Sequence, residues 1–321
     1  MNKIALIYMG GTLGCIGEPL SPMPATQFIP QLQQIFAQDH AITCFVAPVI
    51  KDSSACTAED WLKLVEFIQS LQATFKHFVI IHGTDTLSYA SAVLAQLLGR
   101  SAHVVCTGSQ YPLLNITGTK IRDQSDAYAN LNFALTAVIT QPKGVYLAFH
   151  QRLIHAQTAL KQHTTQLDAF TGIEVDTILQ QHAQAMLIHA EHIHKAKTFN
   201  CVSLMLQPIQ IACHIAFLTA IIAQPPTVLI LQGFGTGNIA VNPELLQILQ
   251  KIRDQNCAVI ISSQVPFGDL DQRYAISNWI QHANFLVDNS YSHADLYAKT
   301  LKMYLKYDTV DQWDQHWHDN V

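Results

Sequence analysis

Residues 78–86 read FVIIHGTDT, an apolar run that ends in a polar turn of glycine, threonine and aspartate. A similar junction lies near the N-terminus, where residues 4–14 read IALIYMGGTLG. Continuous apolar runs rich in β-branched residues are typical of parallel strands that are buried on both faces of a sheet. The two stretches therefore predict buried strands over 4–8 and 78–82, each followed by a loop that carries a threonine hydroxyl.

Similar apolar runs recur along the chain and alternate with helical patterns. They predict further strands over residues 104–107, 145–149, 228–231 and 258–262. An apolar stripe behind Thr57 predicts a helix over 58–71, and a second pattern predicts a helix over 87–98 that ends at Gly99. Strands that alternate with helices in this way predict βαβ units and an α/β fold with a mainly parallel sheet.

The chain has 321 residues, a length that suits two domains better than one. The polar stretch EHIHKAKTFN at 191–200 is soon followed by Pro208, and together they predict a linker over residues 191–208. The larger N-terminal domain, residues 1–190, would hold the catalytic site. The smaller C-terminal α/β domain would span residues 209–321.

Charged residues make up only 13% of the chain, and the formal net charge is −5. Proteins that bind nucleic acid normally show a basic stripe, so we expect no nucleic-acid partner. The low share of charged residues also indicates that part of the surface is covered in the native assembly. Self-association is the usual reason, so the composition predicts a homo-oligomer.

The seven cysteines are odd in number, scattered and without a CxxC pair, which indicates free thiols in a reducing compartment such as the cytoplasm. The apolar run over 211–223 is shorter than the roughly 20 residues that span a bilayer, so it predicts a buried helix and no membrane partner. Histidines gather at 189–194 and at 316–318. Neither group has the cysteine or carboxylate frame of a complete ligand set, so we expect no metal site.

The residues that follow each predicted strand are the candidates for chemistry, because ligands of open α/β sheets bind beyond the carboxyl ends of the strands. In chain order these ends read MGGTLG, HGTDT, TGSQYP and FHQR, and we expect them to converge on one cleft. Taken singly, GGT is also typical of a plain tight turn, and Thr84 or Asp85 could simply cap the next helix. A dinucleotide-binding loop is disfavoured, since the glycines stand at 10, 11, 14 and 17 and not in the G-x-G-x-x-G spacing.

Taken together, GGT after the first strand and HGTDT after a later one resemble the bacterial-type L-asparaginases. Further stretches match the family in the expected order, namely Asp52-Ser53-Ser54, Leu160-Lys161-Gln162-His163, Gly235-Thr236-Gly237-Asn238 and Ser263-Gln264. The chain length, the lack of a signal peptide and the DSS stretch are similar to the cytoplasmic type I branch. The resemblance covers nearly the whole chain.

This resemblance implies a larger flavodoxin-like N-terminal domain, a smaller C-terminal α/β domain, and assembly as a homodimer or homotetramer. It also implies hydrolysis of L-asparagine to L-aspartate and ammonia without a cofactor, with L-glutamine as the alternative substrate. In the family, the threonine that matches Thr12 attacks the amide carbon and forms an acyl-enzyme. The matches to Thr84, Asp85 and Lys161 complete the catalytic set.

The same resemblance implies the substrate-binding residues, which are Gly11, Asp52, Ser53, Ser54 and Gly83. By its match, Ser53 would bind the substrate α-carboxylate together with nearby backbone N–H groups. Asp85 would bind the α-ammonium group in addition to its contact with Lys161. Backbone N–H groups near Thr12 and Thr84 would form the oxyanion hole, which is usually the largest single contribution to catalysis.

One feature of the family is missing from this chain. The family places a tyrosine on a mobile loop soon after GGT, whereas residues 18–24 read EPLSPMP, with Leu20 at or near that position. Tyr8, Tyr89 and Tyr111 are candidate substitutes. The missing tyrosine supports a second hypothesis, in which the chain binds or senses asparagine or aspartate with weak or lost catalysis. A third hypothesis is a nucleotide-binding α/β enzyme that uses the glycine loop.

Overall fold

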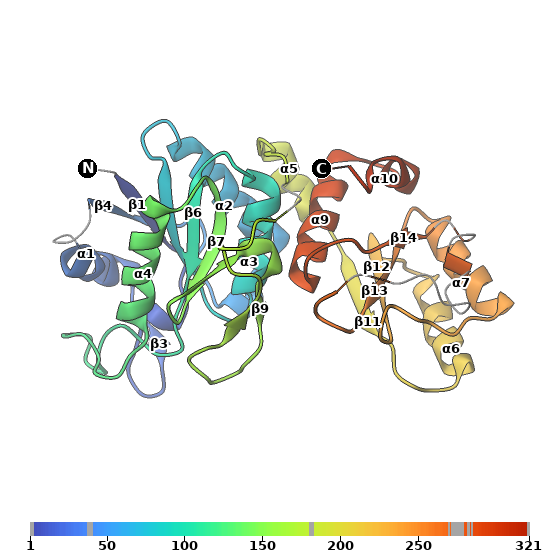
Figure 1. Ribbon diagram of the computed structural model, residues 1–321, viewed down its shortest axis with the longest axis horizontal. Helices are drawn as coiled ribbons and strands as arrows, with labels where there is room; N and C mark the ends of the chain where they lie inside the picture. Colours follow the sequence, from blue (N-terminus) through green and yellow to red (C-terminus); the bar gives the residue numbers. More distant parts are fainter. Residues whose placement is uncertain are drawn as a thin grey trace. The chain divides into compact units, whose positions relative to one another are not determined.

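The computed structural model describes residues 3–36, 41–179, 183–268, 270, 279–280, 283 and 285–319. They belong to two compact units that divide between Lys197 and Thr198 (Figure 1). Each unit has its own sheet and its own apolar core.

A six-stranded sheet forms the centre of the first unit, in the order β4-β1-β5-β6-β7-β8. Its strands are β1 (Ile4–Tyr8), β4 (Ile42–Val46), β5 (His77–Ile81), β6 (His103–Thr107), β7 (Gly144–Phe149) and β8 (Arg152–His155). All neighbours pair in parallel except β8, which lies antiparallel to β7 at the edge. Numbered along the chain, the parallel strands follow the order 2-1-3-4-5 of flavodoxin-like sheets, which confirms the predicted fold class.

Helices cover both faces of this sheet. Helices α1 (Ala25–Phe36) and α4 (Ala127–Thr140) pack on the face that carries Ile4 and Leu6. Helices α2 (Ala58–Leu71) and α3 (Leu87–Leu98) lie on the opposite side of the sheet (Figure 1). Both α2 and α3 span the predicted residues. Their ends follow from local chemistry, since α2 begins at a capping box of Thr57 and Asp60, and α3 ends at Gly99, whose φ of 50° favours glycine.

Two small antiparallel hairpins follow the carboxyl ends of strands in this sheet. One pairs β2 (Cys15–Ile16) with β3 (Ser21–Pro22), directly after GGT. The other pairs β9 (Leu160–Lys161) with β10 (Phe170–Thr171) and carries the predicted lysine. The described residues of this unit also form short 3-10 turns at η1 (Thr12–Gly14), η2 (Ser53–Ala55) and η3 (Ala156–Thr158).

The second unit is built on a four-stranded parallel sheet in the order β11-β12-β13-β14. Its strands are β11 (Cys201–Met205), β12 (Val228–Gly233), β13 (Ala258–Ser263) and β14 (Leu286–Val287). Helices α6 (Ile211–Ile221) and α7 (Pro243–Arg253) cover one face, while α9 (His293–Lys306) and α10 (Val310–His316) pack with the other. This unit is therefore an α/β domain, as predicted.

The predicted linker at 191–208 differs from the structure. Its residues form most of helix α5 (Ala190–Ala196) and all of strand β11. Of the polar residues in this short helix, Glu191 and His194 are exposed and His192 and Lys195 are half-buried, and β11 is the edge strand of its sheet. The division between the two units, at residues 197 and 198, falls inside the predicted range.

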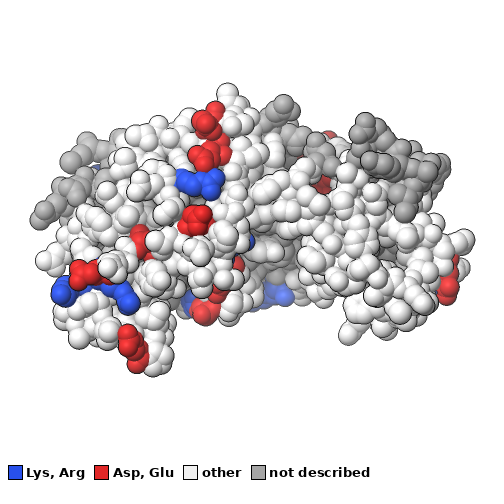
Figure 2. Space-filling view, turned by 60° about the horizontal axis from the view of Figure 1, so that its bottom comes forward, with Lys and Arg blue, Asp and Glu red and all other residues white. Residues whose placement is uncertain are grey.

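The helix predicted over 211–223 forms, but it is not buried. Within α6 only Leu218 is buried, and Phe217 is 54% exposed. No Asp, Glu, Lys or Arg occurs between Lys197 and Glu244, and large parts of the face drawn in Figure 2 carry no charged side chain. Among the described residues, no helix combines the length and the apolar character needed to cross a membrane.

Candidate active site

The loops after β1 and β5 lie against each other with no room for a side chain between them. A Cβ on Gly11 would come within 2.6 Å of both Cα and N of Gly83. A Cβ on Gly83 would in turn lie 2.5 Å from Oγ of Ser53. The strands β1 and β5 are neighbours whose connections leave in opposite directions, so this is the switch point where α/β sheets bind ligands.

Local backbone geometry explains why glycine stands at the start of the first loop. Gly10 and Gly11 have φ values of 98° and 95°, a region that other residues rarely adopt. The chain then enters η1, where Gly14 N–H donates to the Gly11 carbonyl at 3.1 Å. Thr12 is the first residue of this turn and is half-buried, so its position is set by the two glycines before it.

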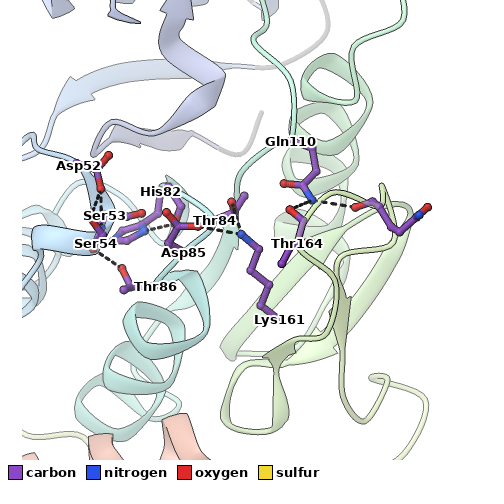
Figure 3. Close-up of polar contacts among 12 residues, drawn as sticks. Asp52, Ser53, Ser54, His82, Thr84, Asp85, Thr86, Gln110, Lys161 and Thr164 are labelled. Atoms are coloured by element: carbon purple, nitrogen blue, oxygen red, sulfur yellow. Dashed lines mark hydrogen bonds and ion pairs between the residues drawn. The ribbon is translucent and has the colours of Figure 1, made fainter. Parts of the chain in front are cut away.

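Lys161 reaches the second loop from the β9–β10 hairpin. Its Nζ donates to Thr84 Oγ1 at 3.0 Å and lies 3.0 Å from Asp85 Oδ1 (Figure 3). The Thr84 side chain is buried, whereas that of Asp85 is 62% exposed. The structure thus brings together three residues that the sequence analysis named for catalysis. An amine beside a hydroxyl can act as a base once it has lost its proton.

Helix capping does not account for Thr84 and Asp85. The residue that caps α3 is Thr86, and its hydroxyl donates to the Ser53 carbonyl at 2.8 Å. The contacts of Thr84 and Asp85 described above go instead to Lys161. The Thr86 bond ties the HGTDT loop to the loop that carries Ser53.

The DSS stretch divides between the buried site and the surface. Ser53 is buried, with its side chain against Gly83. Asp52 Oδ1 accepts bonds from Ser54 N–H at 2.8 Å and from Ser54 Oγ at 2.5 Å, and these bonds lower the pKa of Asp52. Asp52 and Ser54 are both exposed, so they shape the turn, while Ser53 is the member that faces the glycine loops.

His82 has a supporting role that the sequence analysis did not identify. The Trp61 indole N–H can only donate, and it donates to His82 Nε2 at 3.3 Å. The His82 Nδ1 therefore carries the proton and donates to the Gly83 carbonyl at 2.8 Å. Burial lowers the pKa of His82, which keeps the ring neutral. Its place directly before Gly-Thr-Asp was the available signal.

Gln110 is the second residue that the sequence analysis did not single out. It lies in the loop after β6, and its Nε2 donates to the carbonyls of Thr164 and Gln166 at 3.2 Å and 2.9 Å (Figure 3). These carbonyls belong to the loop that joins β9 to β10. The predicted convergence of TGSQYP on the site was the available signal, although the partners are backbone atoms distant in sequence.

The loop that lacks the family tyrosine is held in place by its neighbours. Gly17 N–H donates to the Ile116 carbonyl at 3.2 Å, and Met23 N–H donates to the Gly14 carbonyl at 2.9 Å. Leu20, near the tyrosine position, is 49% exposed. Tyr8 is buried with its ring and hydroxyl against Gly14, and its burial raises its pKa, so this residue is part of the core.

The histidine groups do not form a metal centre in the part of the chain that the structure describes. No cluster of three or more histidine, cysteine, aspartate or glutamate side chains there is arranged to hold an ion. His192 instead accepts the His189 N–H at the start of α5, at 3.1 Å.

Comparisons with known proteins agree with this geometry. Residues 3–194 match the family model described as Asparaginase, N-terminal. The L-asparaginase 1 of Escherichia coli (strain K12) is 27% identical over 299 residues, which cover 89% of this chain and 86% of that protein. The L-asparaginase of Thermococcus kodakarensis is 27% identical over 287 residues, which cover 85% of this chain and 84% of that protein.

Among solved structures, the crystal structure of L-asparaginase I from Vibrio cholerae superposes with a TM-score of 0.78 at 20% identity, covering 99% of this chain and 97% of that one. This likeness confirms the two-domain α/β fold. The family match spans more than half of the chain, and it confirms the resemblance that the GGT and HGTDT motifs suggested. The chain therefore belongs to the asparaginase family and is an amidohydrolase of the asparaginase type.

Proposed function

We propose that this protein hydrolyses L-asparagine to L-aspartate and ammonia through an acyl-enzyme on Thr12. The observation that carries the proposal is the position of Lys161 Nζ, 3.0 Å from both Thr84 Oγ1 and Asp85 Oδ1. Thr84 and Asp85 lie on a loop that packs against the loop of Thr12. The names of the E. coli and T. kodakarensis relatives, both L-asparaginases, support the choice of substrate.

The first half of the reaction forms an ester. Thr12 Oγ1 attacks the side-chain amide carbon, its proton passes to the amide nitrogen, and the C–N bond breaks to release ammonia. The developing oxyanion would be stabilised by backbone N–H groups of the turns around Gly11 and Gly83, held rigid by their mutual contact. The chain's own backbone thus supplies the charge stabilisation.

The second half of the reaction hydrolyses that ester. Water attacks the acyl carbon, its proton returns to Thr12 Oγ1, and L-aspartate leaves. We assign the proton transfers to the Thr84–Lys161 pair, because a lysine that has lost its proton can accept one from a neighbouring hydroxyl or water. Asp85 holds the lysine side chain in position through their ion pair.

We assign recognition of the amino-acid end of the substrate to the DSS turn and Asp85. The buried Ser53 hydroxyl would bind the α-carboxylate, with Asp52 and Ser54 fixing the turn that presents it. Asp85, with its exposed carboxylate, would bind the α-ammonium group. L-glutamine differs by one methylene, which is worth about 1–3 kcal/mol in a pocket, so we expect weaker hydrolysis of it.

A second candidate function is binding or sensing of asparagine or aspartate without turnover. It is favoured by one observation, the exposed Leu20 on a pinned loop where the family has its tyrosine. The two functions differ in a simple measurement. Purified protein incubated with L-asparagine releases equal amounts of ammonia and aspartate if it is a hydrolase. A rise in melting temperature with no ammonia would favour the binding protein and reject the hydrolase.

We further propose a cytoplasmic homodimer or homotetramer in which residues 1–190 form the catalytic domain. All seven cysteines are free thiols, as expected in a reducing compartment. The charge-free stretch between Lys197 and Glu244 supports self-association, because two copies with a net charge of −5 can meet there without like charges opposing each other. Size-exclusion chromatography with light scattering tests the oligomeric state.

A further inference from the structure

We propose that Gln110 is a positioning residue that holds Lys161 in reach of Thr84. This inference rests on the proposed function, since it concerns the same site. It is carried by the side-chain amide of Gln110, whose Nε2 donates two hydrogen bonds to the loop that follows the lysine (Figure 3).

The lysine sits on an element that needs support from outside. Strand β9 has two residues, and among the described residues it pairs with the two-residue strand β10 alone. Of the eight residues between them, 162–168 are all exposed and Ala169 is buried. Isolated two-stranded hairpins are marginally stable at best in water, so bonds from the rest of the fold decide where such a hairpin rests.

Gln110 supplies such bonds. An amide NH₂ has two donors, and both go to carbonyls of this one loop, to Thr164 at 3.2 Å and to Gln166 at 2.9 Å. Within the hairpin itself, Gln162 N–H donates to the Ala169 carbonyl at 2.8 Å. Because the Gln110 bonds lie three and five residues beyond Lys161, they fix the tip of the hairpin while the strand pair fixes its base.

Gln110 is itself anchored to the start of helix α4. Its N–H donates to Asp126 Oδ2 and the Tyr111 N–H donates to Asp126 Oδ1, both at 2.9 Å. Asp126 is buried, and Asn130 Nδ2 donates both to it and to the Gly108 carbonyl, each at 3.0 Å. The lysine hairpin is therefore tied through Gln110 to a buried network on a long helix.

This arrangement separates two functions of the site. Gln110 acts on the side that carries Lys161, whereas Ser53 reaches the site from the other side, on the loop after β4. Loss of the Gln110 bonds should let Lys161 move away from Thr84 without changing the serine side. Misplacing a catalytic group by about 1 Å can cost about 100-fold in rate. We therefore expect the effect in kcat and not in KM.

The test uses Gln110→Glu, which keeps the shape but replaces the donating NH₂ group by a single oxygen atom that faces both carbonyls. With L-asparagine as substrate, we expect kcat to fall about 10- to 100-fold and KM to stay within about twofold. Thr164→Ala is the matched control, because Thr164 contributes its backbone carbonyl to this contact, and it should keep the parent kcat. In a Lys161→Met background, Gln110→Glu should cause no further loss of kcat.

Hydrogen exchange gives a readout that does not depend on activity. The Gln162 amide, protected by the Ala169 carbonyl, should exchange faster in Gln110→Glu than in the parent or in Thr164→Ala. Unchanged exchange overturns the proposal even if the protein hydrolyses asparagine. Faster exchange in a protein without any hydrolysis would reject the proposed function and keep the positioning role. An equal fall of kcat with and without Lys161 would also overturn it.

Discussion

Gly11 and Gly83 lie backbone against backbone, so closely that a methyl group on Gly11 would come within 2.6 Å of Gly83 Cα. Gly83 is packed equally closely against the Ser53 side chain. Three loops that leave the sheet after different strands are thus packed directly against one another at Gly11, Gly83 and Ser53. The contact between Gly11 and Gly83 holds the two threonine motifs next to each other.

The glycine contact predicts a strong effect of Gly11→Ala. The new Cβ would collide with the Gly83 backbone, which cannot move without disturbing Thr84, so we expect activity to fall at least about 100-fold. Gly235→Ala is the matched control. Gly235 also has a positive φ, of 51°, but open space around its Cβ position, so it should cost only about 1–2 kcal/mol of backbone strain.

Ammonia release and thermal unfolding of both variants separate the two effects. We expect Gly235→Ala to lose stability and keep its activity. Equal activity of Gly11→Ala and Gly235→Ala would show that the glycine contact does not organise the site.

Removing the lysine amine should abolish proton transfer while leaving the fold intact. Lys161→Met keeps the length of the side chain but loses the bonds to Thr84 and Asp85. A general base typically contributes a factor of about 100 to 10,000, so kcat should fall by that range. Steady-state kinetics, with circular dichroism as a check on folding, measures it. A kcat within threefold of the parent would exclude Lys161 as the base.

The buried position of Ser53 predicts a binding defect in Ser53→Ala. Loss of the hydroxyl that faces the glycine loops should raise KM for L-asparagine about 10-fold and leave kcat within a few-fold, as expected for a hydrogen bond to a charged group. Ser54→Ala, in an exposed residue whose hydroxyl bonds Asp52, should have a smaller effect. If Ser54→Ala has the larger effect on KM, the assignment of Ser53 is wrong.

The sequence analysis predicted the central strands of the sheets and the helices with a clear apolar stripe, and it missed strands at the sheet edges. Strands β1 and β5 and helices α2 and α3 were predicted because each has a continuous apolar run or a clear apolar stripe. Strand β4 lies at the sheet edge, where Ile42 alone of its five residues is buried, and Thr43 interrupts its apolar run. Strand β11 is also an edge strand without a continuous apolar run, and the sequence analysis therefore assigned it to a linker.

The same distinction holds for the site. Short contiguous sequence motifs identify Thr12, Thr84, Asp85 and Lys161, so these residues can be found without the structure. The role of Gln110 could not be predicted in this way, because its partners are backbone carbonyls 54 and 56 residues away. Every residue has a backbone carbonyl, so the sequence does not show which ones accept these bonds. The neutral state of His82 depends on the indole of Trp61, 21 residues earlier, and only the folded chain brings the two rings together.

Asp60 predicts a pH-dependent part of the stability. Burial acts to raise its pKa, but bonds from Lys51 at 2.6 Å and from Thr57 at 2.8 Å outweigh burial and lower it. A carboxyl group whose pKa is lowered by folding stabilises the protein at any pH above the pKa that this group has in the unfolded chain. This contribution is lost as the pH falls through the lower pKa of the folded state. Asp60→Asn should therefore cost about 1–3 kcal/mol at pH 7.

The difference in the free energy of unfolding between the parent and Asp60→Asn should begin to shrink once the pH drops below the usual aspartate pKa of about 3.9. Urea unfolding at a series of pH values measures it. Glu59→Gln is the control, since it breaks half-buried surface pairs with Lys63 on the same helix and with Lys197 and should change stability much less. A gap that stays constant down to pH 3 would contradict the assigned cause.

The proposed function requires that Thr12 is the nucleophile of an asparagine hydrolase. It is tested most directly by ammonia release from L-asparagine by the parent protein and by Thr12→Ala, measured side by side on folded samples. We predict that the parent releases ammonia and aspartate in equal amounts and that Thr12→Ala loses at least about 1,000-fold in kcat, since the ester of the proposed mechanism forms on the Thr12 hydroxyl. A Thr12→Ala variant that turns over asparagine at the rate of the parent would contradict it.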